Sequence, residues 1–286
     1  MTTALFGPGG NSKSFYDAGF KSTIDAPKFT KEFGLDAYEY EAGNGLFASE
    51  DTLRKIGENA AKYNIKMSIH APYYISLSSL DEEKRKNSSR YILQCANALR
   101  FLGGKTMVIH AGSTAKLERT AALDFAKEAL EFAISKLHDE NLYGVKLGIE
   151  TMGKVNQLGT LDEVLSLCKT DKCVVPVIDF GHMNAREGGG VFNTPEDYAS
   201  VFEKVAAACG DVIAKNLHCH FSKIEYTKGG EKRHLTFDDN LYGPEFEPLM
   251  KAICNLRVTP TIICESSGTM AEDALKMKSA YLSYIG

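Results

Sequence analysis

Short apolar runs that end in a histidine or a carboxylate recur along this chain, and they limit what it can fold into. An apolar run of this length is typical of a buried strand. Histidine and carboxylate are the ligands that zinc and manganese prefer. The repeat therefore predicts strand ends that converge on one multi-metal site. The runs read MSIHAPY (His70), MVIHAGS (His110), LGIETMG (Glu150), PVIDFGH (Asp179, His182), NLHCHFS (His218, His220) and IICESSG (Glu265), with KRHL (His234) in a late polar segment.

The spacing of the runs predicts an α/β fold, a single (β/α)₈ TIM barrel spanning residues 1–286 with the metal site at the C-terminal face of the strands. An open doubly wound sheet is the alternative. It would spread the strand ends along a line, whereas a barrel brings them to one face. Strand-like runs lie near residues 4–7, 35–40, 65–70, 105–110, 145–150, 174–179, 214–220 and 259–265. Helix-like segments begin at Ser49 and cover 81–102, 116–138, 160–169, 194–209, 243–256 and 270–284.

Composition excludes several classes of protein. No apolar run approaches the ~20 residues of a membrane span, and the N-terminus, MTTALFGPGG, lacks the layout of a signal peptide. The seven cysteines are scattered, and no C-x-x-C occurs, which is typical of reduced thiols in a cytoplasmic protein. The net charge of −4 argues against a protein that coats nucleic acid, although a local basic loop can still bind phosphate.

Taken in order, the motifs resemble those of the endonuclease IV family of apurinic/apyrimidinic endonucleases, within the wider xylose-isomerase-like barrels. The resemblance runs nearly end to end. Ala111 stands where that family has a proline. The matching motifs are His70-Ala71-Pro72-Tyr73, Ile109-His110-Ala111-Gly112-Ser113, Glu150-Thr151, Asp179-Phe180-Gly181-His182, His218-Cys219-His220-Phe221-Ser222-Lys223, Arg233-His234 and Glu265.

The resemblance implies a zinc-dependent hydrolase that cuts DNA 5′ to abasic sites by a zinc-activated hydroxide, with two or three Zn²⁺ ions, or Mn²⁺, at the barrel mouth. Ions about 3.5–4 Å apart can clamp both the attacking and the leaving oxygens. The catalytic carboxylates would be Glu150 and Glu265. By the resemblance, the first ion would be held by His70, His110 and the bridging Glu150, the second by Glu150, Asp179, His218 and Glu265, and the third by His182 and His234.

Two departures from the family pattern affect the ligands. Lys232 stands two residues before His234, where the family has an aspartate, and a protonated lysine cannot bind a metal. Glu231 could substitute, because this loop is longer by about one residue. Separately, His218 and His220 lie two apart on one strand and point to the same face. Alignment on the Ser222-Lys223 pair favours His218 as the ligand and leaves His220 open.

A third departure concerns DNA contact. The loop after the second strand, residues 43–47, carries no arginine, although Leu46 or Phe47 could wedge into a base stack or pack against the barrel rim. Tyr73 and Tyr74 occupy positions where the family inserts side chains at the abasic gap. Lys223 and Arg233, with Lys228 and Lys232 between them, form a basic patch that we expect to bind phosphate.

Other polar residues receive structural roles at this level. Glu39 and Glu41 share one face of the second strand and could reach the site, although we expect them at an exposed or rim position. His138 is expected on the surface without a role, and residues 7–11 as a plain turn.

The preferred function is therefore an AP endonuclease in base excision repair, acting as a monomer on DNA with abasic sites and on no membrane. The alternative is a divalent-metal sugar isomerase or epimerase on the same barrel, because fold alone does not separate the two.

Overall fold

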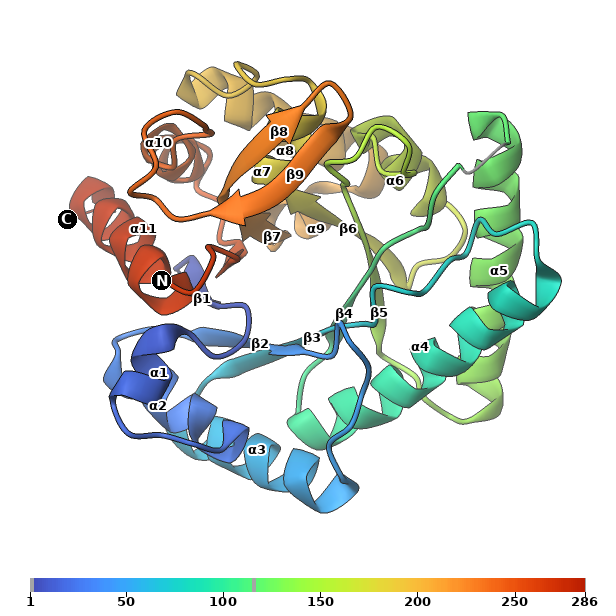
Figure 1. Cartoon of the computed structure of the whole chain (residues 1–286), viewed down its shortest axis with the longest axis horizontal. Coiled ribbons are helices and arrows are strands. Elements are labelled where there is room, and N and C mark those ends of the chain that lie inside the picture. The colour runs from blue at the N-terminus through green and yellow to red at the C-terminus, as the bar shows by residue number, and fades with distance from the viewer. Residues whose placement is uncertain (1–2, 115–116, 286) are drawn as a thin grey trace.

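Eight parallel strands form the centre of the computed structural model, which describes residues 3–114 and 117–285. They pair in the order β1-β10-β7-β6-β5-β4-β3-β2 and curve into a nearly closed barrel with the helices outside it (Figure 1). The predicted (β/α)₈ barrel is confirmed. Its strands are β1 (Leu5–Pro8), β2 (Ala37–Glu41), β3 (Lys66–His70), β4 (Thr106–Ile109), β5 (Lys146–Glu150), β6 (Val174–Asp179), β7 (His218–Phe221) and β10 (Thr261–Cys264).

The barrel closes where β1 lies against β2. Gly10 N donates to Glu39 O at 3.0 Å just beyond the end of β1. One layer lower, a side chain at Gly7 would overlap the carbonyl of Ala37, so only glycine lets the two backbones approach this closely. The closure brings the side chains of β2 into the same interior as those of β7 and β10.

The seven predicted helices all form. Ser49 caps the first by accepting from Thr52 N at 3.2 Å, and Thr194 caps α8 in a capping box with Asp197. Position 116, where one prediction began, lies outside the described residues. The seven are α3 (Glu50–Tyr63), α4 (Glu82–Leu102), α5 (Arg119–Asp139), α6 (Leu161–Leu167), α8 (Pro195–Cys209), α10 (Glu247–Leu256) and α11 (Met270–Ile285).

Shorter elements that the sequence did not predict also occur. Among them, α7 follows β6 directly, and the Asp179 carboxylate accepts from His182 N at 2.6 Å as its N-cap. This turn directs both side chains toward the barrel mouth. The short elements are α1 (Lys13–Asp17), a 3₁₀ turn (Thr23–Asp25), α2 (Ala26–Glu32), α7 (Phe180–Arg186) and α9 (Asp211–Lys215).

A β-hairpin stands where the sequence predicted a basic loop. Strands β8 (Lys223–Thr227) and β9 (Gly230–Leu235) pair antiparallel and project over one side of the barrel mouth (Figure 1). Their polar composition hid them, because neither strand carries an apolar run.

Apolar side chains fill the layer between strands and helices, with Ile92, Leu99 and Leu130 fully buried there. The barrel interior is different, because it holds buried polar side chains such as Glu39 and Ser68. Across the described residues, no helix combines the length and the apolarity needed to cross a bilayer.

Candidate metal centre

Glu150 ends β5 and lies fully buried at the centre of the barrel mouth. Its Oε2 is 2.9 Å from His110 Nε2 and 3.4 Å from His70 Nε2. Its Oε1 is 2.9 Å from His220 Nδ1 and 3.5 Å from His182 Nδ1. Because each oxygen faces a different pair of imidazoles, Glu150 has the geometry of a carboxylate that can bridge two cations.

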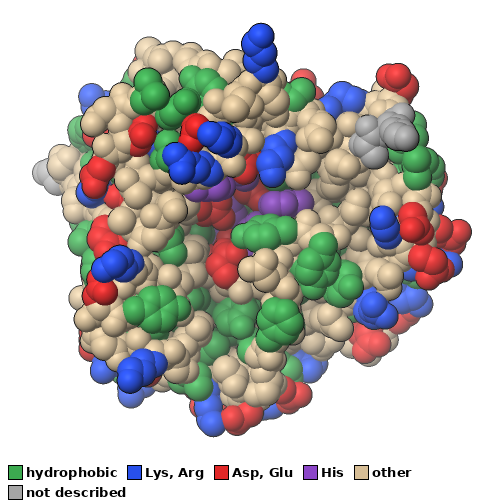
Figure 2. All heavy atoms as spheres, in the orientation of Figure 1, with side chains coloured by type: hydrophobic (Ala, Val, Ile, Leu, Met, Phe, Trp, Pro, Cys, Tyr) green, Lys and Arg blue, Asp and Glu red, His purple; other side chains and the backbone are tan. Residues whose placement is uncertain are grey.

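Among the described residues, five groups of side chains bring their donor atoms within 4.8 Å of one another, and three of these groups contain Glu150 or the hairpin residue Glu231. These three border a cavity of ≈ 420 Å³, and histidine and acidic side chains fill the hollow at the centre of the face in Figure 2. The three groups are His70, His110 and Glu150; Glu150, Asp179, His220 and Glu265; and His182, Glu231 and His234.

A buried carboxylate oxygen without a hydrogen-bond partner indicates whether these residues suit a cation. Asp179 is fully buried, and its Oδ2 has no hydrogen-bond partner among the described residues. A buried carboxylate oxygen left unpaired is costly unless a cation balances it. Imidazole nitrogens surround it together with the oxygens of Glu150 and Glu265, and this mixed set is the one that zinc prefers. The residues present therefore fit a divalent metal ion.

The contacts between Glu150 and the surrounding imidazoles also shift the pKa values of these groups. Burial raises the pKa of Glu150, but the charge of His220 and the hydrogen bonds from His110 and His182 outweigh it and hold the pKa well below its usual range. Burial lowers the pKa of His70, yet its hydrogen bond to Glu150 and the charges of Glu41 and Glu150 raise that pKa to about 10. Metal ligands must be deprotonated, so a bound cation would displace protons from these imidazoles.

The structure separates the two histidines of β7. His220 lies with Glu150 and Glu265, at 2.9 and 3.1 Å from its Nδ1. His218 lies one layer deeper, where its Nε2 is 2.9 Å from Glu39 Oε2. The preference for His218 as the ligand in the Glu150 group is not supported by this placement, whereas the alternative left open, His220, occupies that position.

Glu231, and not Lys232, faces the barrel mouth beside His182. Register along the hairpin shifts so that Glu225 pairs with Arg233 and Tyr226 with Glu231, which leaves Lys232 as an extra residue in a bulge. The bulge turns Lys232 outward, where its Nζ is 2.6 Å from Glu225. Glu231 then faces the mouth, with Oε2 3.4 Å from His182 Nε2.

Glu39 is a buried part of the site, not the rim residue that the sequence predicted. It is fully buried and touches both histidines of β7, so the rim expectation was wrong for it. Glu41 lies nearer the opening and accepts the Tyr73 hydroxyl at 3.1 Å. Burial, and then the charges of Glu265 and Glu39 against that of His70, raise the pKa of Glu41 to about 7. The alternation in AYEYE placed both carboxylates on one face, but it could not show that this face points into the barrel interior toward β7.

Aromatic side chains line the opening. Tyr73 stacks on His110 with ring centroids 5.4 Å apart, and it remains half exposed. Tyr74 is half exposed as well, and Phe47 in the loop after β2 is 85% exposed. Leu46, in contrast, packs against the core. Apolar surface therefore adjoins the metal-ligand cluster at the mouth, as Figure 2 shows.

The two basic residues predicted to bind DNA lie in different environments. Lys223 is buried, and its ammonium donates to Asp239 O and to Glu245 Oε1, both at 2.7 Å. Because it is buried and paired, its charge is not presented to a ligand. The sequence shows the charge of Lys223 but not its burial. Arg233 is exposed on the hairpin and pairs with Glu225 at 2.6 Å. His138 lies beside Tyr143, away from the cluster.

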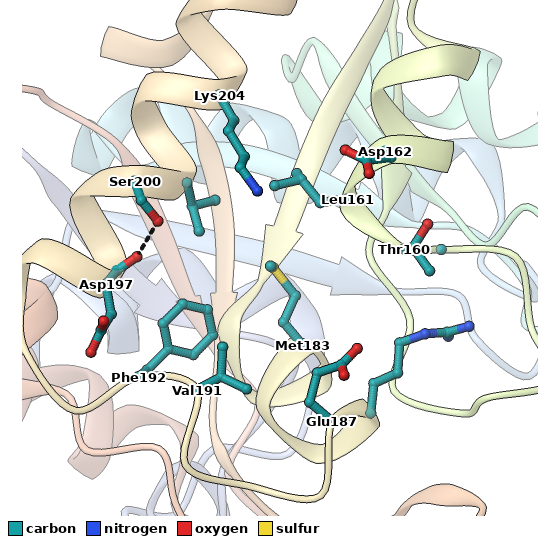
Figure 3. A pocket seen from close by; sticks show the side chains of 13 residues that line it. Thr160, Leu161, Asp162, Met183, Glu187, Val191, Phe192, Asp197, Ser200 and Lys204 are labelled. Atoms are coloured by element: carbon teal, nitrogen blue, oxygen red, sulfur yellow. Dashed lines mark hydrogen bonds between the residues drawn. The ribbon is translucent and has the colours of Figure 1, made fainter.

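A second hollow lies outside the barrel, between α6, α7 and α8 (Figure 3). Its ≈ 250 Å³ is floored by apolar side chains such as Met183 and Phe192, with Lys204 directed over them. None of the clustered ligand residues lines it, so the chemistry of the molecule centres on the barrel mouth.

Comparison with known proteins gives a consistent picture of the fold. The sequence model described as a xylose isomerase-like TIM barrel matches residues 27–281. An uncharacterised protein of Methanocaldococcus jannaschii is 36% identical over 248 residues, which cover 87% of this chain and 88% of that one. A probable endonuclease 4 of Mycoplasma pneumoniae is 27% identical over 198 residues, or 67% of this chain and 64% of that one.

Solved structures share the same barrel. A D-tagatose 3-epimerase-like protein superposes with a TM-score of 0.73 at 20% identity, covering 98% of this chain and 97% of that chain. Endonuclease IV from Thermus thermophilus superposes with a TM-score of 0.64 at 16% identity, covering 98% of each chain. At these identities the likeness shows the fold alone, and the choice of activity depends on the residues at the mouth.

Proposed function

The chain belongs to the xylose isomerase-like TIM barrel family, and on that premise we propose that it is a zinc-dependent endonuclease that cleaves DNA on the 5′ side of abasic sites. The observation that carries the proposal is the mouth cluster itself. Five histidines and four carboxylates form three contiguous groups there, and Glu150 belongs to two of them. Relatives named as probable endonuclease 4 support the same class of reaction.

The side chains divide the work by charge. Divalent ions, Zn²⁺ or Mn²⁺, lower the pKa of a bound water and stabilise charge on the attacking and leaving oxygens of a phosphodiester. Neutral imidazoles such as His70 and His110 supply position, while Glu150 supplies negative charge at the centre. Glu265 faces two groups at once, with Oε1 3.1 Å from His220 and Oε2 3.8 Å from His234. Glu150 and Glu265 are therefore the proposed catalytic carboxylates.

Access to a phosphate inside a duplex requires the DNA to open. An abasic site lowers that cost, which is otherwise about a few kcal/mol, because no base pair has to be broken. The half-exposed rings of Tyr73 and Tyr74 and the exposed Phe47 can stack where the base is missing. Tyr73 also touches His110, so a ligand stacked on this ring lies beside the metal ligands. In this proposal Arg233, and not the buried Lys223, contacts the DNA backbone.

One feature favours a sugar isomerase or epimerase instead. Glu39, Glu41 and Glu265 bring three carboxylates within 4.8 Å of one another on the β2 side of the mouth. Such a set repels a polyanion such as DNA and suits a neutral polyol. The alternative would use the group of Glu150, Asp179, His220 and Glu265 as a single-metal site, and would leave the histidines of the other two groups without a role.

A nicking assay decides between the two. Zinc-loaded protein is incubated without magnesium with a labelled duplex that carries one tetrahydrofuran abasic analogue, and with the matched intact duplex. We expect cleavage of the abasic duplex alone, loss of cleavage at high salt, and a Tyr73→Ala variant that keeps its zinc but cleaves more slowly. An uncut duplex, together with turnover of a ketose or aldose in a parallel screen, would reject the endonuclease in favour of the isomerase.

A further inference from the structure

A second layer of polar side chains lies beneath the candidate metal centre, inside the barrel. Glu39 of β2 and His218 of β7 meet there across the interior, because β2 and β7 are not neighbours in the sheet. Ser68 of β3 joins them by donating its hydroxyl to Glu39 Oε2 at 2.7 Å. All three are buried, and none belongs to the three groups around the mouth cavity.

The second layer contacts the first at the ring of His220. His220 Nε2 lies 2.8 Å from Glu39 Oε1, on the side of the imidazole opposite Glu150 and Glu265. Both atoms are buried, and neither has an aligned hydrogen-bond partner among the described residues. The other oxygen of Glu39 already accepts from Ser68 and His218. Among the described residues, Oε1 is therefore the Glu39 oxygen still free to accept from His220, the imidazole nearest to it.

We propose that Glu39 is a positioning residue, which holds the proton of His220 on Nε2 and thereby presents the bare Nδ1 to the ion shared with Glu150, Asp179 and Glu265. Carboxylates lie beside both nitrogens of this ring, Glu150 and Glu265 at Nδ1 and Glu39 at Nε2. Once an ion takes Nδ1, the remaining ring proton is on Nε2, where the Glu39 carboxylate can only accept it and so favours that tautomer. Carboxylates in this position orient a metal-ligating histidine and raise its basicity. The inference deepens the proposed function and rests on its metal centre.

A competing arrangement uses the same atoms. Glu39, His218 and His220 bring their donor atoms within 4.8 Å, so they could hold an ion of their own. That would require His220 to bind through Nε2 while Nδ1 faces Glu150, and one imidazole serves two ions only after losing both ring protons. Ser68 and His218 moreover occupy Glu39 Oε2 as donors. The arrangement favours a carboxylate that supports a ligand over a separate cation site.

The test measures zinc affinity in the full-length protein by competition with a chromophoric chelator. Glu39→Ala should weaken one zinc by about 10- to 100-fold, the range typical of such supporting residues. Glu39→Gln should recover part of the loss, because the amide oxygen can still accept from Nε2. Glu41→Gln is the matched control for charge: it removes a carboxylate two residues along the strand, near His70 but bonded to Tyr73, and should leave the ring proton of His220 on Nε2.

Two further readouts separate positioning from folding. Nitrogen-15 NMR of the ring should show Nε2 protonated in the zinc-bound wild type and a mixture of tautomers in Glu39→Ala, while thermal unfolding of the metal-free proteins reports stability. Equal zinc affinity in wild type and Glu39→Ala, or a whole equivalent of zinc lost in His218→Ala, would overturn the proposal. If the wild type binds zinc but does not nick abasic DNA, the proposed function fails while the role of Glu39 is still decided.

Discussion

Candidate ligand residues at the barrel mouth come from two kinds of backbone. Glu150, Asp179 and His220 lie on the strands β5, β6 and β7, whose hydrogen bonds to neighbouring strands hold them on both sides. Glu231 and His234 lie on the hairpin β8–β9, a separate two-stranded sheet. A barrel strand cannot move without breaking its hydrogen bonds to the neighbouring strands, whereas an isolated hairpin is only marginally stable by itself.

The hairpin is attached to the barrel through the loop that follows β5. Glu231 N donates to Gly153 O at 3.0 Å, and Val155 N donates to Gly229 O at 3.1 Å. At the crossing, a side chain at Gly230 would overlap the carbonyl of Gly153, and one at Gly153 would press on Glu231. Two glycines therefore let the hairpin approach closely enough to place Glu231 at the mouth.

Two arginine side chains hold the loop after β5 in place by donating hydrogen bonds to its carbonyls. Arg186 of α7 donates to the carbonyls of Met152, Lys154 and Val155 at 2.8 to 3.1 Å. Arg119 of α5 donates to Val155 O at 3.0 Å as well. The position of the group of His182, Glu231 and His234 therefore depends on these arginine side chains. The positions of the groups around Glu150 depend on the strand pairing of the barrel. We expect metal binding by His182, Glu231 and His234, the hairpin-borne group, to be lost before metal binding around Glu150 and independently of it.

The largest expected effect is that of Glu150→Gln, which acts on the strand-borne side. The amide keeps the volume but removes the charge shared by two groups, so bound zinc should fall by more than one ion per chain. Activity should drop by at least about 10²- to 10³-fold, the size typical of losing one charge-stabilising group. Elemental analysis and the nicking assay measure both. Full activity after chelation and return of zinc would contradict the bridging role.

Glu231→Ala should affect the hairpin-borne group alone. The variant should lose one zinc and retain those around Glu150, because Glu231 belongs only to the group that it forms with His182 and His234. Lys232→Ala is the matched control, since Lys232 points outward to Glu225 and should leave zinc content unchanged. A crystal structure with three fully occupied ions and Glu231 turned to solvent would refute the substitution.

Sequence alone located the strand-borne side well. His70, Glu150 and Glu265 end apolar runs, and a barrel must bring such ends to one face. The two-residue period of β7 could not separate His218 from His220, because both point inward and only depth along the strand distinguishes them. Depth depends on register between strands that are distant in sequence.

The hairpin side was less accessible to prediction. Its strands carry no apolar run, so the sequence predicts a basic loop about one residue longer than in the family, and not a hairpin with a bulge at Lys232. The sequence predicts Lys223 in a phosphate-binding patch, whereas the side chain is buried against Asp239 and Glu245. Pairing and burial here result from contacts with the loop after β5, which local sequence does not reveal.

Arg186→Ala should have a moderate effect that reaches the hairpin without touching a ligand. Loss of the brace should loosen the loop that carries Gly153, and the hairpin-borne zinc should bind about 10-fold more weakly while the Glu150 zincs keep their affinity. Lys204→Ala is the control, because Lys204 lines the same outer hollow (Figure 3) but lies on α8, away from the loop carbonyls that Arg186 holds. Equal weakening of all ions would show that the two sides are not separable.

The smallest expected effect is a pH dependence of the brace itself. Glu163 accepts from Arg119 at 2.7 and 2.8 Å and from Gly159 N and Thr160 N at the end of the loop. Burial raises the pKa of Glu163, but these hydrogen bonds outweigh it and hold the pKa at about 2, below the usual 4.5. A carboxylate with a lowered pKa contributes stability that is fully present above about 4.5 and is lost as the pH falls toward about 2.

Comparison of wild type with Glu163→Gln isolates this contribution from those of the buried carboxylates at the mouth. In urea unfolding of the metal-free proteins, the wild type should be the more stable above about pH 4.5, and the difference should shrink as the pH falls toward about 2. The difference should be modest, because Arg119 is partly exposed and water screens the pair. A difference that does not change with pH would show that Glu163 acts by packing alone. The brace on the hairpin side would then be independent of charge, unlike the cluster around Glu150.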